Sequence, residues 1–335
     1  MFNKLCDWAT RLMVLWVILA GIYGYFSPAH LVALKPGFGL LFAFTMLGIG
    51  LAIKPEDFRP IITQPQYILL GTLAQFAIMP LLGFIIAKAL RLPPDLAVGV
   101  ILVGSAPGAM ASTMISYIAK ADVAYSAALT CSTTFLAPVL TPGFTWLFAH
   151  KFVAVDVRKL FLDIVFTVIV PLLLGLSLKH FFSRWIQNIV KPFLAVSALF
   201  IALICGSVVA LNSARIADLS LIIFIAVALH NGLGLLLGYG AGVLYRFDLK
   251  RRRTVAFEVG MQNAGLGALL AVRNFSDQAA LPNVLFAIWC VITASVLAEY
   301  WARRTPDSPA PGPEATGAPA RAPGLTCASG DPQSQ

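Results

Sequence analysis

Charged residues are scarce in this chain. Of its 335 residues only 12% are Asp, Glu, Lys or Arg, whereas 59% are hydrophobic. A water-soluble domain cannot bury that much apolar surface, so the composition excludes a soluble protein and predicts one that crosses a membrane several times. The net charge of +9 does not indicate a nucleic-acid partner, because the positive residues lie between apolar runs, where membrane topology explains them.

The chain also lacks the cysteine and histidine patterns of disulfide-stabilised proteins, metal sites and enzymes. Its cysteines are odd in number, scattered and mostly within apolar runs, as small core residues are: Cys6, Cys131, Cys205, Cys290 and Cys327. The histidines lie in four different segments, so no metal or nucleophile constellation is evident: His30, His150, His180 and His230. His230, with apolar neighbours before Asn231, is typical of a helix–helix hydrogen bond rather than of a ligand.

Ten apolar runs are long enough to cross about 30 Å of hydrocarbon. We expect spans near 8–27, 37–53, 67–90, 95–119, 123–149, 158–179, 190–211, 217–245, 254–272 and 278–301. No small-residue cleavage site follows the first run, which therefore predicts a span rather than a removed signal peptide. Residues 302–335 are rich in Pro, Ala, Gly and Ser and predict a disordered tail.

Lys and Arg are distributed unevenly between the two ends of these spans. With ten spans, 16 of the 24 Lys and Arg residues fall on the side that holds both termini. Excess positive charge marks the cytoplasm, so we expect a multi-pass protein of the cell inner membrane with both termini and the tail cytoplasmic.

An internal repeat is visible at an offset of 155 residues. Arg91 falls opposite Arg246, and Leu81-Leu82-Gly83 falls opposite Leu236-Leu237-Gly238. This offset predicts a first five-span repeat over 1–151 and a second over 152–301. Because five is odd, the two copies must be inserted in opposite senses, which is typical of secondary transporters.

Two of the expected spans are interrupted at equivalent positions of the repeat. Gly104 to Ala109 breaks the fourth span and Gly260 to Gly265 breaks the ninth, with Pro107 opposite Gln262. Proline removes a backbone donor, and unwound backbone leaves carbonyls free for cations and helix N-termini free for anions. Matched interruptions therefore predict a binding site near the middle of the membrane.

Glu258 stands beside the second interruption, and no Lys or Arg occurs between Thr254 and Val272 to pair with it. An ionised side chain at that depth costs about 2.5–3.5 kcal/mol on insertion scales, so a cation taken from solution is a plausible partner. Hydroxyl groups suited to sodium, a hard cation, lie on the fourth and fifth spans: Ser112, Thr113, Ser116, Ser126, Thr130, Ser132, Thr133 and Thr134. Each hydroxyl alone is also explained by bonding to its own helix. Gln75 stays open between a helix–helix hydrogen bond and a ligand.

These residues resemble the bile acid:sodium symporter family. The specific match is Glu258-Val259-Gly260-Met261-Gln262-Asn263, and Gly104 to Thr134 with Thr141-Pro142 is similar to a second block. The resemblance covers about residues 8–301. It implies an all-α polytopic membrane protein of ten transmembrane helices, built as two inverted five-helix repeats with panel and core domains and two broken, crossing helices.

The resemblance also implies two sodium sites and a cavity for substrate. The first sodium site would use Ser112, Thr113, Ser126, Thr130 and Glu258. The second would use Gln75, Glu258 and Gln262 with the backbone carbonyls of Val259 and Met261. Substrate would meet Asn263, Gly108, Ala109 and Thr113.

Three positions depart from the family pattern. Thr113 replaces the usual Asn, Ala109 replaces the second glycine of a pair, and Cys290-Val291 after Trp289 replaces a polar pair. The first change shortens the reach of a sodium ligand, and the last makes the cavity wall less polar.

We therefore expect sodium-coupled symport of an organic anion by alternating access, with no organic cofactor. Bile-acid-like steroids, pantothenate-type precursors, keto acids and other small carboxylates all stay open as substrates. A proton-coupled transporter is an alternative, because a buried Glu can carry a proton, although the clustered hydroxyls favour sodium. A membrane sensor or scaffold that binds a ligand without moving it is the alternative of another class, and an intramembrane enzyme is disfavoured.

Overall fold

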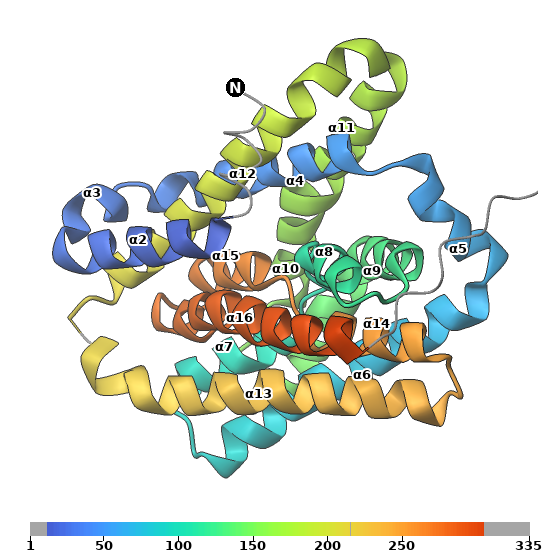
Figure 1. Ribbon diagram of the computed structural model, residues 1–335. Helices are drawn as coiled ribbons and strands as arrows, with labels where there is room; N and C mark the ends of the chain where they lie inside the picture. The colour runs from blue at the N-terminus through green and yellow to red at the C-terminus, as the bar shows by residue number, and fades with distance from the viewer. Residues whose placement is uncertain (1–11, 215, 305–335) are drawn as a thin grey trace, which may run out of the picture.

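The computed structural model describes residues 12–214 and 216–304, which form helices joined by short connections (Figure 1). The first half comprises α2 (Met13–Phe26), α3 (Pro28–Val32), α4 (Phe38–Ala52), α5 (Arg59–Thr63), α6 (Pro65–Ala89), α7 (Pro94–Ser105), α8 (Ala111–Ile118) and α9 (Val123–Ala149). The second comprises α10 (Val157–Ile164), α11 (Val170–Phe181), α12 (Ser183–Leu211), α13 (Ile216–Leu244), α14 (Leu249–Gly260), α15 (Ala264–Asn274) and α16 (Leu281–Arg304). Short 3₁₀ helices η1 (Lys35–Gly37), η2 (Pro55–Phe58) and η4 (Gln278–Ala280) and a π-helical turn η3 (Val165–Ile169) complete the chain. The all-helical prediction is confirmed for this part of the chain.

Seven helical stretches of the described residues are long and apolar enough to cross a membrane. They are Pro28–Ala52, Pro65–Ala89, Val123–Ala149, Val157–Phe181, Ile189–Leu211, Leu221–Leu244 and Gln278–Arg304. Seven of the expected spans coincide with them. The expected span 8–27 corresponds to the shorter α2, and 95–119 and 254–272 are divided into α7–α8 and α14–α15. The protein is a multi-pass membrane protein.

The end of the last helix differs from the expectation. α16 continues to Arg304, so the first three residues of the expected tail, 302–304, are helical. Glu299 and Arg303 form an ion pair at 3.0 Å one helical turn apart, which favours this extra turn. The rest of the tail prediction, 305–335, lies outside the described residues.

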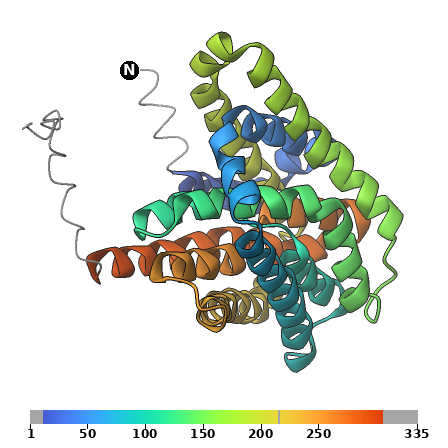
Figure 2. The ribbon, with the colours of Figure 1, turned by 90° about the vertical axis from the view of Figure 1, so that its right-hand side faces the viewer.

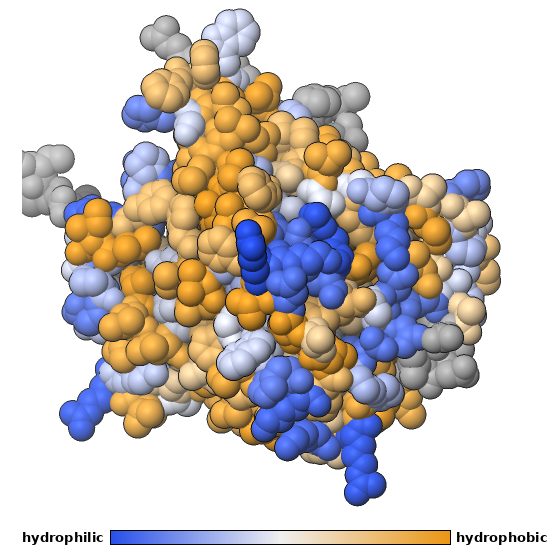
Figure 3. All heavy atoms as spheres, turned by 180° about the vertical axis from the view of Figure 1, so that it is seen from behind, coloured by the Kyte–Doolittle hydropathy of each residue, from blue (hydrophilic) through white to orange (hydrophobic). Residues whose placement is uncertain are grey.

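The surface agrees with a lipid environment. Leu40, Ile62 and Leu244 are 78%, 80% and 77% exposed, and many other large apolar side chains are also exposed. Figure 3 shows apolar residues covering much of one face, interrupted by hydrophilic patches. Exposed apolar area on this scale is unfavourable in water but favourable against lipid tails.

The helices pack as two groups. α2, α4, α11 and α12 pack mainly against one another, whereas α6, α7, α9, α13, α14 and α16 form the other group. In Figures 1 and 2, α6 and α13 lie on one side of the molecule and α2, α4 and α12 on the opposite side, with α8, α9 and α16 between them.

Glycines let the helices of the first group approach closely. A Cβ on Gly50 of α4 would lie 2.3 Å from the Leu172 carbonyl oxygen, and one on Gly24 of α2 would lie 2.3 Å from that of Gly206 in α12. Small residues at such crossings are the usual means of packing helices in lipid, where hydrophobic burial adds little.

Helix boundaries recur at the offset found in the sequence. α7 (Pro94–Ser105) and α14 (Leu249–Gly260) are each 12 residues long and begin and end 155 residues apart. Arg91 and Arg246, also 155 apart, both adopt a positive φ, of 50° and 57°. These left-handed residues end α6 and α13 and turn the chain into the two interrupted segments.

Candidate functional site

The two interruptions meet in space. The amide of Asn263 donates to the Pro107 carbonyl at 2.8 Å, and that of Ala109 donates to the Met261 carbonyl at 3.2 Å. Gly108 and Gln262 thereby form a single antiparallel bridge between segments that are otherwise helical. Unwound backbone within a membrane needs such partners, because lipid offers none.

Three hydroxyl groups converge on Glu258, which is fully buried at the end of α14. Ser112 of α8 donates to its Oε1, Ser126 of α9 donates to the same oxygen at 2.5 Å, and Thr130 donates to Oε2 at 2.7 Å. All three hydroxyl-bearing residues are themselves fully buried. Because the donors are neutral, they solvate the carboxylate without cancelling its charge.

Thr113 lies at the edge of this cluster. Its hydroxyl is 3.4 Å from that of Ser126, and the residue is only partly buried. Three further hydroxyls of α9 donate to carbonyls of their own helix: Ser132 at 2.8 Å, Thr133 at 3.1 Å and Thr134 at 2.7 Å. Thr133 also accepts from the Gly108 amide at 3.3 Å.

A second group of oxygens gathers between α6 and the interruptions. The side-chain nitrogen of Gln75 donates to Gln262 Oε1 at 3.2 Å and contacts the Ala106 carbonyl at 3.4 Å. The nitrogen of Gln262 donates to the Val259 carbonyl at 2.8 Å. Gln75 Oε1 is buried and has no hydrogen-bond partner in the described structure. A buried amide oxygen without a donor is unusual and indicates a missing partner such as an ion.

Gly108 lies close against the carboxylate of Glu258. A Cβ there would lie 2.9 Å from Glu258 Oε2 and 3.6 Å from the hydroxyls of Thr130 and Thr133. The bend therefore places backbone directly against the carboxylate.

Asn263 has a structural role that the sequence did not predict. Its side-chain oxygen accepts the Leu266 amide at 3.1 Å and caps α15. It also lines a small pocket between the helix groups, together with Met46, Ile49, Ile53, Met110, Cys131, Thr134 and Leu172. Apart from Asn263 and Thr134, this lining is apolar or weakly polar.

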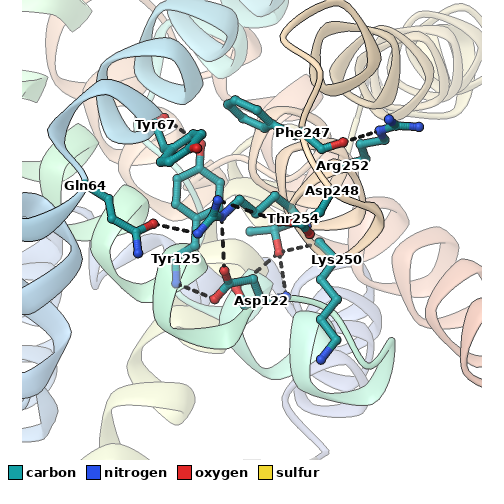
Figure 4. A network of polar contacts seen from close by, with 10 residues as sticks. Gln64, Tyr67, Asp122, Tyr125, Phe247, Asp248, Lys250, Arg252 and Thr254 are labelled. Carbon is teal, nitrogen blue, oxygen red and sulfur yellow. Dashed lines mark hydrogen bonds and ion pairs between the residues drawn. The ribbon is translucent and has the colours of Figure 1, made fainter. Parts of the chain in front are cut away.

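A polar network fixes the helices that carry these groups (Figure 4). Asp122 caps α9 by accepting the Tyr125 amide at 3.0 Å, and its own amide donates to the Thr254 hydroxyl of α14 at 3.0 Å. Tyr125 donates to the Tyr67 carbonyl of α6 at 2.7 Å. Ser126 and Glu258 therefore stand on helices that are tied together within about one turn of each residue.

The chain is similar in sequence to known proteins. The family model described as the Sodium Bile acid symporter family matches residues 39–219. The sodium-dependent transporter YocS of Bacillus subtilis (strain 168), described as uncharacterized, is 37% identical over 302 residues, covering 90% of this chain and 94% of YocS. The chloroplastic protein BASS1 of Arabidopsis thaliana, a probable sodium/metabolite cotransporter, is 33% identical over 296 residues, or 87% of this chain and 73% of BASS1.

The chain belongs to the sodium bile acid symporter family. The prediction of family is confirmed, and the relatives are named as transporters or cotransporters, not as enzymes. The matched segment 39–219 contains the first interruption and α9. This member of the symporter family is thus similar in sequence to proteins named as sodium-dependent transporters or cotransporters.

Sequence reasoning missed two buried residues of this symporter-family member. Arg253 is only 5% exposed and donates to the Ala119 carbonyl at the end of α8 at 3.0 Å, although the sequence suggested a cytoplasmic charge. Asn231 of α13 is fully buried and donates to the Gly260 carbonyl at 2.8 Å. The signal that could have pointed to Asn231 is its neighbour His230, which falls opposite Gln75 at the repeat offset of 155 residues. His230 contacts the Met79 carbonyl of α6 at 2.9 Å, as expected of a helix–helix hydrogen bonder.

Proposed function

We propose that this protein is a sodium-coupled symporter that carries an organic anion by alternating access. The observation that carries the proposal is the convergence of three buried hydroxyls on Glu258 where two interrupted helices meet. A carboxylate surrounded by neutral oxygens forms a suitable cradle for a small hard cation.

Two sodium sites share Glu258 in this proposal. The first consists of Ser112, Thr113, Ser126, Thr130 and Glu258, and the hydrogen bonds of these side chains support it. The second consists of Gln75, Glu258, Gln262 and the carbonyls of Val259 and Met261. The unpartnered oxygen of Gln75 supports this second site, because sodium would supply the missing contact.

The proposed architecture is a pair of inverted five-helix repeats with ten transmembrane helices. Matching boundaries of α7 and α14 and the shared turn at Arg91 and Arg246 support the repeats, with boundaries near 1–151 and 152–301. The two packing groups support a division into panel and core domains that rock against each other. In this proposal both termini are cytoplasmic and the membrane is the cell inner membrane.

The substrate in this proposal is an anion with an apolar body. Gly108, Ala109, Thr113 and Asn263 lie by the N-terminal ends of α8 and α15, where helix dipoles favour negative charge. The pocket beside Asn263 has a mostly apolar lining but room for only about one water molecule, so in this proposal it widens during the transport cycle to admit the body of an organic carboxylate. Sodium at Glu258 would reduce the local negative charge, so each ligand raises the affinity of the other by the same factor.

Uptake into proteoliposomes tests this function. A panel of labelled organic anions is offered with an inward sodium gradient, with sodium replaced by choline, and with a pH gradient alone. We expect accumulation only with sodium, and its loss in Glu258→Gln. If two sodium ions accompany one monovalent anion, a potential of 100 mV, inside negative, adds about 2.3 kcal/mol of driving force per cycle. Uptake in choline that follows the pH gradient would establish proton coupling, and anion binding without flux would establish a sensor.

A further inference from the structure

The interrupted helix α14 is held at its end by a side chain from α13. Asn231 Nδ2 donates to the Gly260 carbonyl at 2.8 Å, and Gly260 is the last residue of α14. The final carbonyls of a helix lack partners within the helix and must find them elsewhere. Here the partner is Asn231, and the carbonyl that it holds, that of Gly260, lies two residues along the chain from Glu258.

The orientation of the Asn231 amide is fixed by its second contact. Thr293 of α16 donates its hydroxyl to Asn231 Oδ1 at 2.6 Å. The Gly260 carbonyl can only accept, so the amide nitrogen must face it and the amide oxygen must face Thr293. Thr293 therefore donates to Asn231, and Asn231 donates to Gly260.

Close packing keeps this contact in place. A Cβ on Gly260 would lie 2.5 Å from Cδ2 of Leu235 and 3.0 Å from its backbone nitrogen, so α13 presses directly on the end of α14. Leu235 is one helical turn from Asn231 and shares its face. The Gly260 carbonyl thus cannot turn away from α13 without losing both the hydrogen bond to Asn231 and the packing against Leu235.

The neighbouring carbonyls face the interruption instead. The Val259 carbonyl accepts from the side chain of Gln262 at 2.8 Å, and the Met261 carbonyl accepts from the amide of Ala109 at 3.2 Å. Three successive carbonyls therefore have three different partners, and only the middle one is directed to α13. We propose that Asn231 and Thr293 are positioning residues for the second sodium site. They hold the Gly260 carbonyl on α13, so that the Val259 and Met261 carbonyls stay directed at the interruption, where the second lone pair of each oxygen can meet the ion.

A similar contact is made by a side chain of α6. Gln75 of α6 directs its amide nitrogen to the Ala106 carbonyl, 3.4 Å away, just after α7 ends. α6 and α13 each bring a buried amide to the end of the interrupted helix that follows them in the chain. The positioning role of Asn231 rests on the proposed sodium coupling, because it acts through carbonyls assigned to sodium.

The test is a sodium titration of the full-length purified protein, with choline keeping the ionic strength constant. The readout is the thermal unfolding midpoint as a function of sodium, which gives a half-saturating concentration without any transport. Asn231→Leu and Thr293→Val should raise that concentration about tenfold, as loss of outer-shell partners does in metal sites. Thr293→Ser, which keeps the donor, should stay close to the unmodified protein.

Asn283→Leu is the matched control. Asn283 of α16 is also fully buried and donates to a carbonyl of another helix, that of Gly99 at 3.2 Å, but its hydrogen bonds go to Gly99 and Ala279 and not to the end of α14. Equal sodium titration of Asn231→Leu, Thr293→Val and the unmodified protein would overturn the proposal, as would an equal shift in Asn283→Leu. If Asn231→Leu does not fold, Thr293→Val decides. If sodium does not change the unfolding midpoint of the unmodified protein, sodium coupling itself is wrong. If the sodium response is lost in Glu258→Gln but is normal in Thr293→Val, only the positioning role is refuted.

Discussion

The backbone amide of Asn263 and the backbone carbonyl of Pro107, 156 positions apart in the chain, form a hydrogen bond of 2.8 Å. Each belongs to an interrupted helix, and each would lack a partner if the other segment were absent. The two interruptions therefore satisfy one another where water is absent. A change at one interruption should consequently be felt at the other.

Gly108→Ala should weaken the sodium response. The new Cβ would lie 2.9 Å from Glu258 Oε2, closer than side-chain contacts normally allow, so the carboxylate must move from its hydroxyl donors. We expect the half-saturating sodium concentration to rise at least about threefold, equivalent to ~0.7 kcal/mol of binding free energy. Sodium-dependent thermal stabilisation measures it.

The control for this change is Gly143→Ala in α9, where an added Cβ meets no atom within 4 Å. It should titrate as the unmodified protein does. If Gly108→Ala did so as well, the close approach of backbone and carboxylate would not matter for sodium.

Thr113→Asn should strengthen the first sodium site. Thr113 lies 3.4 Å from the Ser126 hydroxyl at the partly exposed edge of the cluster, and its short side chain limits its reach toward Glu258. Asparagine is longer and adds a carbonyl oxygen, a better ligand for a hard cation. We expect the half-saturating sodium concentration to fall in the same thermal titration. A rise instead would show that the hydroxyl is already well placed and that the longer side chain crowds it.

The site was predictable where its signals are local. Proline beside glycine weakens a helix locally, so the segments at Pro107 and Gly260 marked the interruptions, and the lack of a nearby Lys or Arg marked Glu258. Proline alone was not enough, because Pro80, Pro138 and Pro142 stand inside continuous helices. The structure brings Ser112, Ser126 and Thr130 to that carboxylate as expected, and their role with sodium stays a prediction.

Contacts set by helix packing were not predictable. Asn231 and Arg253 find carbonyls of other helices, and nothing in their own neighbourhood of the sequence indicates which face of a helix meets which partner. Nor did an apolar sequence indicate the π-helical turn at Val165–Ile169, since periodicity does not resolve one extra residue in a turn.

Gly50→Ala should destabilise the packing of α4 on α11. The added Cβ would lie 2.3 Å from the Leu172 carbonyl oxygen and 3.1 Å from the Gly175 Cα, so two backbones must separate. We expect a lower thermal unfolding midpoint with or without sodium, because α4 and α11 belong to the other packing group from α14, which carries Glu258, and Gly50 is far from Glu258 in the chain. Gly240→Ala in α13, which meets nothing within 4 Å, should keep or raise the midpoint, since alanine favours a helix by about 1 kcal/mol over glycine. Equal midpoints for both variants would contradict the close packing.

Two ion pairs that join segments far apart in the chain should respond differently to charge removal. Lys35 and Asp277 lie 2.7 Å apart but are 41% and 30% exposed, so Lys35→Ala should cost no more than about 1 kcal/mol. Asp163 is only 11% exposed in its side chain and binds Arg273 at 3.0 Å and Asn274 at 2.8 Å. Asp163→Ala removes the acceptor of Arg273 and one of two acceptors of Asn274, whose side chain also donates to the Leu270 carbonyl at 3.1 Å, and should cost about 1–3 kcal/mol.

These two pairs also bear on transport. Arg273 and Asn274 end α15, which begins beside Asn263, so Asp163 fixes the far end of the helix that the second interruption starts. If α15 separates from α4 and α10 at this end in alternating access, Asp163→Ala should favour the separated state. In a chain whose five native cysteines are replaced, it should then let an added aqueous thiol reagent reach a cysteine introduced at Gly39, beside Arg273. Lys35→Ala should increase that labelling less. Labelling unchanged in Asp163→Ala would mean that α15 does not part from α4 and α10 at this end.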